Sequence, residues 1–151
     1  MPATATNVGT VVQIIGSTLD AEFETLPAIY NALRIAITDP ATGKETVLTC
    51  EVQQHLGRNR VRAVGLGSTD GVKRGQEIVD TGSPVMMPVG SETLGRIFNL
   101  IGDTIDNGPQ VSDDCPRRPI HKLAPKFEDL TPEDEIFVTG IQVLDLLTPY
   151  P

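Results

Sequence analysis

From Gly9 to about Gly82, apolar and polar residues alternate in short segments that turn residues separate. Alternation with a period of two is typical of half-buried antiparallel strands. In the clearest segment, Thr18–Glu24, three apolar side chains face one way and three acidic side chains face the other. The same alternation is found in Arg34–Thr38 and Arg60–Val64 and, less regularly, in Val47–Gln53. We therefore predict five or six strands in this region.

Turn chemistry separates the predicted strands at Asp39–Gly43, at Gly57–Asn59 and in the loop Gly65–Gly71. Strands at a spacing of about ten residues are typical of a small sandwich or barrel. Closure into a barrel removes the exposed edges that an open sheet leaves. We therefore predict a β-barrel as the first domain, over residues 1–82, and a mainly β chain.

After Gly82 the periodicity becomes helical. Ser91–Ile101 is predicted to be a short amphipathic helix because its apolar residues recur at helical spacing and Gly102 follows it. Ser112–Pro125 carries three prolines and is predicted to be an extended connector without a packed element. A second helix is predicted from about Thr139 to Leu147. Residues 83–151 have too few apolar residues to form a core of their own.

Composition excludes several functional classes. The chain has 12 basic and 20 acidic residues, which gives a net charge of −8, and only 4% of its residues are aromatic. General nucleic-acid binding, including an oligonucleotide-binding barrel, is therefore disfavoured. No apolar stretch approaches the roughly 18 residues of a membrane span. Met1–Asn7 has neither a charged signal start nor the arginines of a transit peptide, so we expect a cytoplasmic location.

Two glycine-containing segments superficially resemble phosphate-binding loops. Gly43-Lys44 is followed by Glu45 instead of serine or threonine, and Thr38 stands where the first glycine is required. We interpret this segment as a hairpin turn. In Gly65–Gly71 the third glycine comes one residue late and no helical pattern follows, so we interpret this segment as a connection between strands.

The remaining chemically active side chains form no complete active site. His55 and His121 have no nucleophile beside them in sequence, and we interpret both as structural or solvent-exposed. Cys50 and Cys115 lie 65 positions apart without a metal-binding spacing, and we expect reduced thiols. Two acidic clusters lack the spacing of a calcium loop and are interpreted as solvated loops: Asp113-Asp114 and Glu133-Asp134-Glu135.

Eight groups of segments, in order and in register over essentially the whole chain, carry a resemblance to one family. They are Leu26–Leu33; Gln54–Gly57; Thr69–Gly71 with Arg74-Gly75; Asp80–Gly82; Pro88–Gly90; Thr93–Asn99; Pro119–His121 with Ala124-Pro125; and Thr139–Ile141 with Asp145–Leu147 and Pro149-Tyr150. Together they resemble the catalytic beta subunits of F-type ATP synthases. Gln142, where a lysine is usual in that family, is a departure from the pattern.

The resemblance implies a six-stranded N-terminal barrel followed, in residues 83–151, by the incomplete start of an α/β P-loop nucleotide-binding domain. In that family the phosphate-binding loop, the catalytic carboxylate, the Mg²⁺ ligands and the adenine-contacting residues come after the stretch that resembles Asp145–Tyr150. No catalytic, cofactor-binding or metal-binding residue is therefore carried over to this chain. ATP, ADP and Mg²⁺ are expected to bind the full subunit, and this chain alone is expected to be inactive.

The resemblance also implies partners. Three beta subunits would alternate with three alpha subunits around a central stalk, peripheral to the cytoplasmic side of an inner membrane, and ion flow would drive ATP formation. The barrels would form a crown, joined edge to edge, that holds this ring together. The alternative is a non-enzymic barrel module that binds a partner subunit. In either case, we expect the chain after Pro109 to be loosely held.

Overall fold

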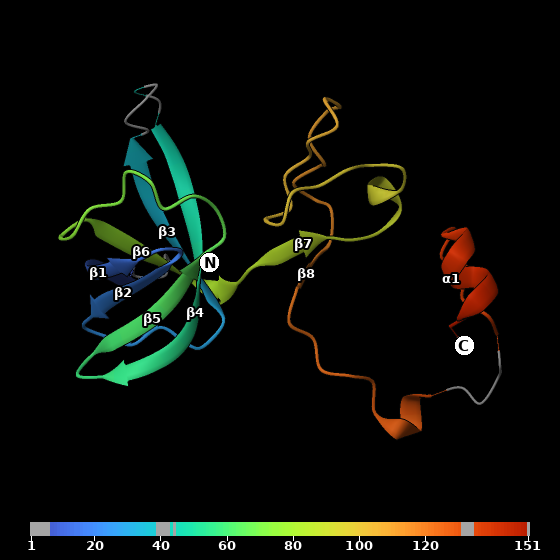
Figure 1. Cartoon of the computed structure of the whole chain (residues 1–151), viewed down its shortest axis with the longest axis horizontal. Coiled ribbons are helices and arrows are strands. Elements are labelled where there is room, and N and C mark those ends of the chain that lie inside the picture. The colour runs from blue at the N-terminus through green and yellow to red at the C-terminus, as the bar shows by residue number, and fades with distance from the viewer. Residues whose placement is uncertain (1–6, 39–42, 44, 131–134, 151) are drawn as a thin grey trace. The chain divides into compact units, whose positions relative to one another are not determined.

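The computed structural model describes residues 7–38, 43, 45–130 and 135–150 (Figure 1). The chain divides into two compact units, Met1–His121 and Lys122–Pro151. The sequence predicted a domain boundary near Gly82, which remains a prediction.

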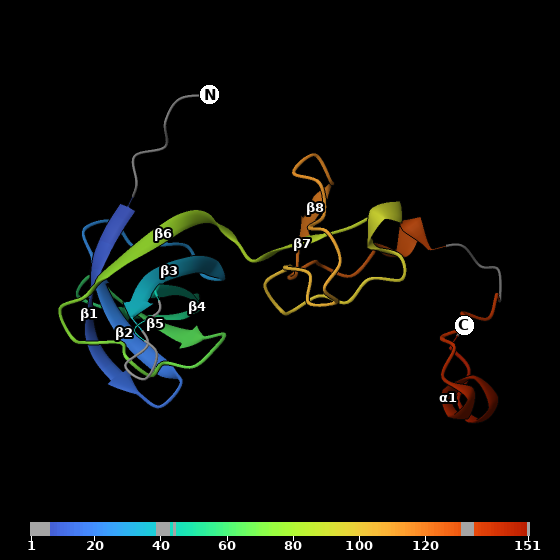
Figure 2. The ribbon, with the colours of Figure 1, turned by 90° about the horizontal axis from the view of Figure 1, so that it is seen from above.

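Six strands of the first unit close into a barrel, as predicted (Figures 1 and 2). Each strand pairs antiparallel with its neighbours, in the order β1-β2-β5-β4-β3-β6. The strands are β1 (Asn7–Ile15), β2 (Thr18–Phe23), β3 (Asn31–Thr38), β4 (Glu45–Gly57), β5 (Arg60–Gly65) and β6 (Glu77–Pro84). The chain is therefore mainly β, and its barrel has no unpaired edge.

The core of the barrel comes from the apolar positions of the alternating segments. Leu19, Ala21 and Phe23 on β2 are all buried, whereas Glu22 between them is exposed. The buried cluster also includes Val11, Leu33, Ile35, Ile37, Leu48, Cys50, Val52, Val61, Ala63 and Ile78. Gly9 on β1 allows a close approach of β2, because a Cβ there would lie 2.6 Å from the Glu22 carbonyl oxygen and from the Phe23 ring. Burial of this cluster is the main stabilising contribution to the barrel.

The turn predicted after Gly57 joins β4 and β5. Arg58 and Asn59 both have left-handed backbones, with φ of 49° and 59°. Two residues with positive φ make the type I′ turn whose twist suits a two-residue hairpin. The turn predicted at Asp39–Gly43 and the interpretation of Gly43-Lys44 lie, except for Gly43 itself, outside the described residues.

The helix predicted over Ser91–Ile101 is wrong. Only a 3₁₀ turn, η1 (Ser91–Thr93), forms there, and Gly95 follows with φ of 71°. The Asn99 side-chain oxygen then accepts hydrogen bonds from the N–H groups of Ile101 and Asp103. A left-handed glycine and a side chain that competes for backbone donors both act against a continuous helix.

The prediction that Ser112–Pro125 contains no packed element is also wrong. Strand β8 (Arg117–Pro119) pairs antiparallel with β7 (Met86–Pro88), and Cys115 just before it is buried. Proline did not prevent this pairing, because three-residue strands need few backbone donors. Whether the chain after Pro109 is loosely held stays a prediction.

The second unit contains η2 (Phe127–Asp129) and α1 (Gln142–Leu147). The second predicted helix is confirmed, although it begins three residues later than expected. The Asp145 carboxylate accepts hydrogen bonds from the N–H groups of Thr139 and Gly140 and from the Thr139 hydroxyl, which fixes the chain just before the helix. No helix among the described residues combines the length and the apolar character that crossing a membrane requires.

Candidate functional site

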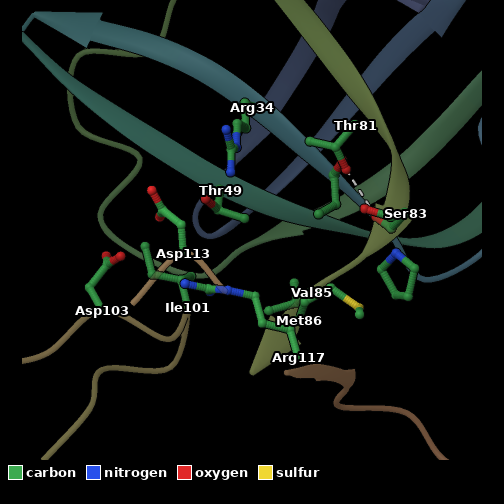
Figure 3. A pocket seen from close by; sticks show the side chains of 12 residues that line it. Arg34, Thr49, Thr81, Ser83, Val85, Met86, Ile101, Asp103, Asp113 and Arg117 are labelled. Atoms are coloured by element: carbon green, nitrogen blue, oxygen red, sulfur yellow. Dashed lines mark hydrogen bonds between the residues drawn. The ribbon is translucent and has the colours of Figure 1, made fainter. Parts of the chain in front are cut away.

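A hollow of about 460 Å³ opens between strands β3 and β6 of the barrel and residues 86–117 (Figure 3). Arg34 on β3 and Arg117 on β8 both line the hollow, and Figure 3 shows their side chains. Asp103 and Asp113 line the same space, so charges of both signs meet there. All four residues are exposed, so water screens their charges.

The Thr81 hydroxyl group in the hollow is used by the protein itself. Thr81 Oγ1 lies 2.8 Å from the Ala32 carbonyl oxygen and 2.9 Å from that of Ser83, and these bonds stabilise the bend at the end of β6. The hollow therefore offers exposed charges, whereas its Thr81 hydroxyl is already engaged by backbone oxygens. Asp113, one of the predicted solvated acids, lines the hollow and is exposed. The neighbouring Asp114 is exposed as well. Glu133 and Asp134 of the other cluster lie outside the described residues.

A bidentate ion pair joins β2 and β5 on the outer wall of the barrel. Arg62 donates from Nε to Asp20 Oδ1 at 2.8 Å and from Nη2 to Oδ2 at 2.9 Å. The Asp20 side chain is only 11% exposed, whereas that of Arg62 is 40% exposed. The hydrogen bonds from Arg62 hold the pKa of Asp20 below its usual value, against the opposing effect of burial.

A second ion pair organises the segment in which the helix was predicted. Arg96 donates from Nε to Asp106 Oδ2 at 2.5 Å and from Nη2 to the Pro109 carbonyl oxygen at 2.6 Å. Asp106 also accepts hydrogen bonds from the N–H groups of Ile97 and Gly108. The bonds from Arg96 and then those from the backbone lower the pKa of Asp106. This pair thus folds Ile97–Pro109 back on itself as a loop.

Both histidines make specific contacts in the first unit. His55 Nε2 donates to the Pro27 carbonyl oxygen at 2.7 Å. His121 Nε2 lies 2.9 Å from Glu51 Oε2, and its ring stacks on the ring of Tyr30 with the centroids 4.2 Å apart. Neither contact pairs a histidine with a nucleophile. Sequence reasoning missed Glu51 because its partner is 70 residues away.

The two cysteines are free and buried. Burial raises the pKa of the Cys50 thiol to about 12, so Cys50 remains a neutral thiol at ordinary pH. Cys115 Sγ lies 3.5 Å from the Val89 carbonyl oxygen. Among residues 7–38, 43, 45–130 and 135–150, no group of three or more histidine, cysteine, aspartate or glutamate side chains is placed to hold a metal ion. The expected absence of catalytic, cofactor-binding and metal-binding residues stays a prediction.

The first two residues of the loop Gly65–Gly71 donate backbone hydrogen bonds to residues of the barrel region. The N–H of Gly65 donates to the Ser17 carbonyl oxygen at 2.7 Å, and that of Leu66 donates to the Thr49 carbonyl oxygen at 2.8 Å. These N–H groups are therefore not available to a phosphate, in contrast to those of a phosphate-binding loop.

A comparison with protein families gives a match that falls on the barrel. Residues 11–82 match the model described as "ATP synthase alpha/beta family, beta-barrel domain". The matched range begins within β1 and ends within β6, so it spans all six strands of the closed barrel. The six-stranded barrel of this chain is thus similar, over residues 11–82, to the beta-barrel domain of the ATP synthase alpha/beta family.

Proposed function

We propose that this chain is the N-terminal region of a catalytic beta subunit of an F-type ATP synthase, and that its barrel holds together a ring of alternating alpha and beta subunits. The observation that carries the proposal is the family match over residues 11–82, which coincides with the closed barrel. The eight groups of segments that resemble beta subunits favour beta over alpha. The full subunit would bind ATP, ADP and Mg²⁺ and make ATP from ADP and phosphate with the energy of a transmembrane ion gradient.

The architecture of the barrel supports a mechanical role. Every strand is hydrogen-bonded on both sides, so neighbouring barrels would contact each other through side chains and not by joining strand edges. Exposed apolar side chains on the barrel could be covered in such a ring; they include Val8, Ile15, Ile29, Tyr30 and Val47. A closed barrel with a buried core deforms little, which suits a rigid ring of barrels next to domains that move.

The charge of the chain and the chemistry of the hollow support the rest of the proposal. A net charge of −8 suits partner proteins better than nucleic acid. Phosphoryl transfer requires positioned cations and a preorganised phosphate cradle, whereas Arg34 and Arg117 are exposed and share their hollow with two aspartates. We therefore propose that this chain alone does not hydrolyse ATP. We place the assembled subunit at the cytoplasmic side of the membrane, attached through the complex.

Assembly with purified subunits tests the proposal. The intact chain is mixed, in separate arms, with the alpha subunit and with the beta subunit of an F-type ATP synthase, and the products are measured by native mass spectrometry. A complex in which this chain alternates with alpha supports the proposal. Assembly with beta alone would instead indicate an alpha-type barrel. Failure to assemble with either would contradict the ring role and favour a barrel module for another partner.

A further inference from the structure

A buried carboxylate on the barrel is bound by a residue far along the chain. Glu51 lies on β4, and its side chain is 7% exposed. Its Oε1 accepts a hydrogen bond from Gln53 Nε2 at 2.6 Å, and its Oε2 accepts one from His121 Nε2 at 2.9 Å. A buried carboxylate that loses a partner is destabilised, because water does not replace the lost bond fully. Removal of the His121 side chain would therefore leave the buried Glu51 carboxylate with one hydrogen-bond partner fewer.

The other face of this contact is formed by Tyr30. Its φ of 71° is a left-handed backbone that a bulky side chain rarely adopts. Its N–H donates to the Val52 carbonyl oxygen at 2.8 Å, which ties the loop between β2 and β3 to β4. The Tyr30 ring then stacks on His121 with an angle of 27° between the ring planes. Tyr30 and Glu51 thus hold the imidazole from two sides.

Strands β7 and β8 are attached to the barrel by few polar contacts. They pair with each other and not with any barrel strand. Within the described part of residues 86–121, the hydrogen bond from His121 to Glu51 is the one side-chain hydrogen bond that reaches strands β1–β6. The hollow beside Arg34 and Arg117 shows that this attachment is incompletely packed. His121 is also the last residue of the first unit.

We infer that Glu51, His121 and Tyr30 form a latch that fastens the β7–β8 pair to the barrel, and that β7–β8 opens as a unit when the latch is released. Release leaves the barrel closed, because no barrel strand pairs with β7 or β8. Within the opened β7–β8 pair, the hydrogen bond from Val89 N–H to the Pro116 carbonyl oxygen remains, whereas the bond from Ile120 N–H to the Val85 carbonyl oxygen, next to His121, is lost with the latch. The three latch residues belong to one chain, so the latch can be tested on the isolated chain, without the proposed ring assembly.

Hydrogen exchange of the intact chain, measured by mass spectrometry, tests the latch. With His121→Ala, the Ile120 amide is expected to exchange about tenfold faster, while barrel amides on β2 and β5 change by less than about twofold. Cleavage by trypsin gives a second readout. The Arg117–Arg118 peptide bond lies in β8, and trypsin does not cleave the following Arg118–Pro119 bond because proline comes after it. Cleavage after Arg117 is expected to accelerate by a similar factor.

Matched variants separate a latch from general destabilisation. His55→Ala removes another histidine bond of β4, that to Pro27, and should leave β7–β8 exchange unchanged. Combining Glu51→Gln with His121→Ala should be no worse than His121→Ala alone, since the contact to His121 is already lost and the remaining amide oxygen can still accept from Gln53. Should His121→Ala fail to fold, Tyr30→Leu gives the same comparison through the stack alone. Equal acceleration in barrel and β7–β8, or no acceleration in either, would overturn the inference.

Discussion

Single residues in this protein act mainly through the partners that the barrel gives them. Asp20 stands at a polar position of an alternating strand, where the sequence predicts a solvent-facing side chain, yet it is buried. The cause is Arg62, which lies directly opposite on β5 and covers the carboxylate while pairing with it. Long cationic side chains commonly cover their neighbours in this way. Burial of a charge on the outer wall is therefore a property of the strand pair and not of either residue.

The Asp20–Arg62 pair predicts a loss of stability in acid. Because the pKa of Asp20 in the folded chain lies below its ordinary value of 3.8, the charged form stabilises the fold above that pH. As the pH falls through the lowered pKa, Asp20 becomes protonated and this stabilisation is lost. Urea denaturation should therefore show a difference between the wild type and Asp20→Asn at pH 7 that becomes smaller as the pH is lowered below 3.8.

The exposed pair of Glu22 and Arg60 on the same two strands supplies the control. Both side chains are about half exposed, at 50% and 46%, so Glu22→Gln should lower the urea midpoint at pH 7 less than Asp20→Asn does. An Asp20→Asn difference that stays the same size as the pH is lowered below 3.8 would show that the pair is not linked to proton binding.

At the level of elements, the sequence predicts the barrel well because its signal is local. In β2, β3 and β5 the alternation itself decides which side chains enter the core. The helical spacing of Leu94 and Ile97 is misleading, because these side chains do not form the buried face of a helix. In the structure they are 78% and 59% exposed. Strands β7 and β8 escape prediction, since three residues carry no periodicity and their pairing joins positions about 30 residues apart.

The same limit applies to the functional residues. Glu51 and His121 each look ordinary in sequence, and only the closed barrel and the path of the chain after β8 bring them together. The match to a family model falls on the barrel, because such a model compares residues over the whole barrel sequence, whereas periodicity compares near neighbours only. Contacts between distant residues are therefore the part of the site that neither composition nor spacing predicts.

The β4–β5 hairpin carries local strain that a substitution can relieve. Arg58 occupies a left-handed position of the type I′ turn, at which asparagine is favoured and arginine is not. Arg58→Asn is expected to stabilise the barrel by about 0.5–1 kcal/mol, measured by thermal or urea denaturation. Arg74→Asn serves as the control, because Arg74 is also exposed but has no left-handed backbone, and its stability should be unchanged. Equal effects of both substitutions would show that backbone strain is not the cause.

For the whole molecule, the two units differ in how much each buries. The barrel has a continuous core and a closed ladder of backbone hydrogen bonds. In the second unit, large apolar side chains stay exposed, as Leu123 at 90%, Phe127 at 89% and Leu146 at 81% show. Burial of apolar surface is the main favourable contribution to folding, so the barrel should account for most of the stability of the chain.

This contrast predicts two very different rates of hydrogen exchange in one chain. Helix α1 has six residues, too few for a stable isolated helix, and no buried side chain. Its amides should therefore exchange at least about 100-fold faster than the core amides of β4 and β5. Asp145→Asn, which weakens the bonds to Thr139 and Gly140, should accelerate exchange in α1 further and leave the barrel unchanged. Protection of α1 equal to that of β4 would instead mean that packing stabilises the second unit, because a six-residue helix cannot reach that protection alone.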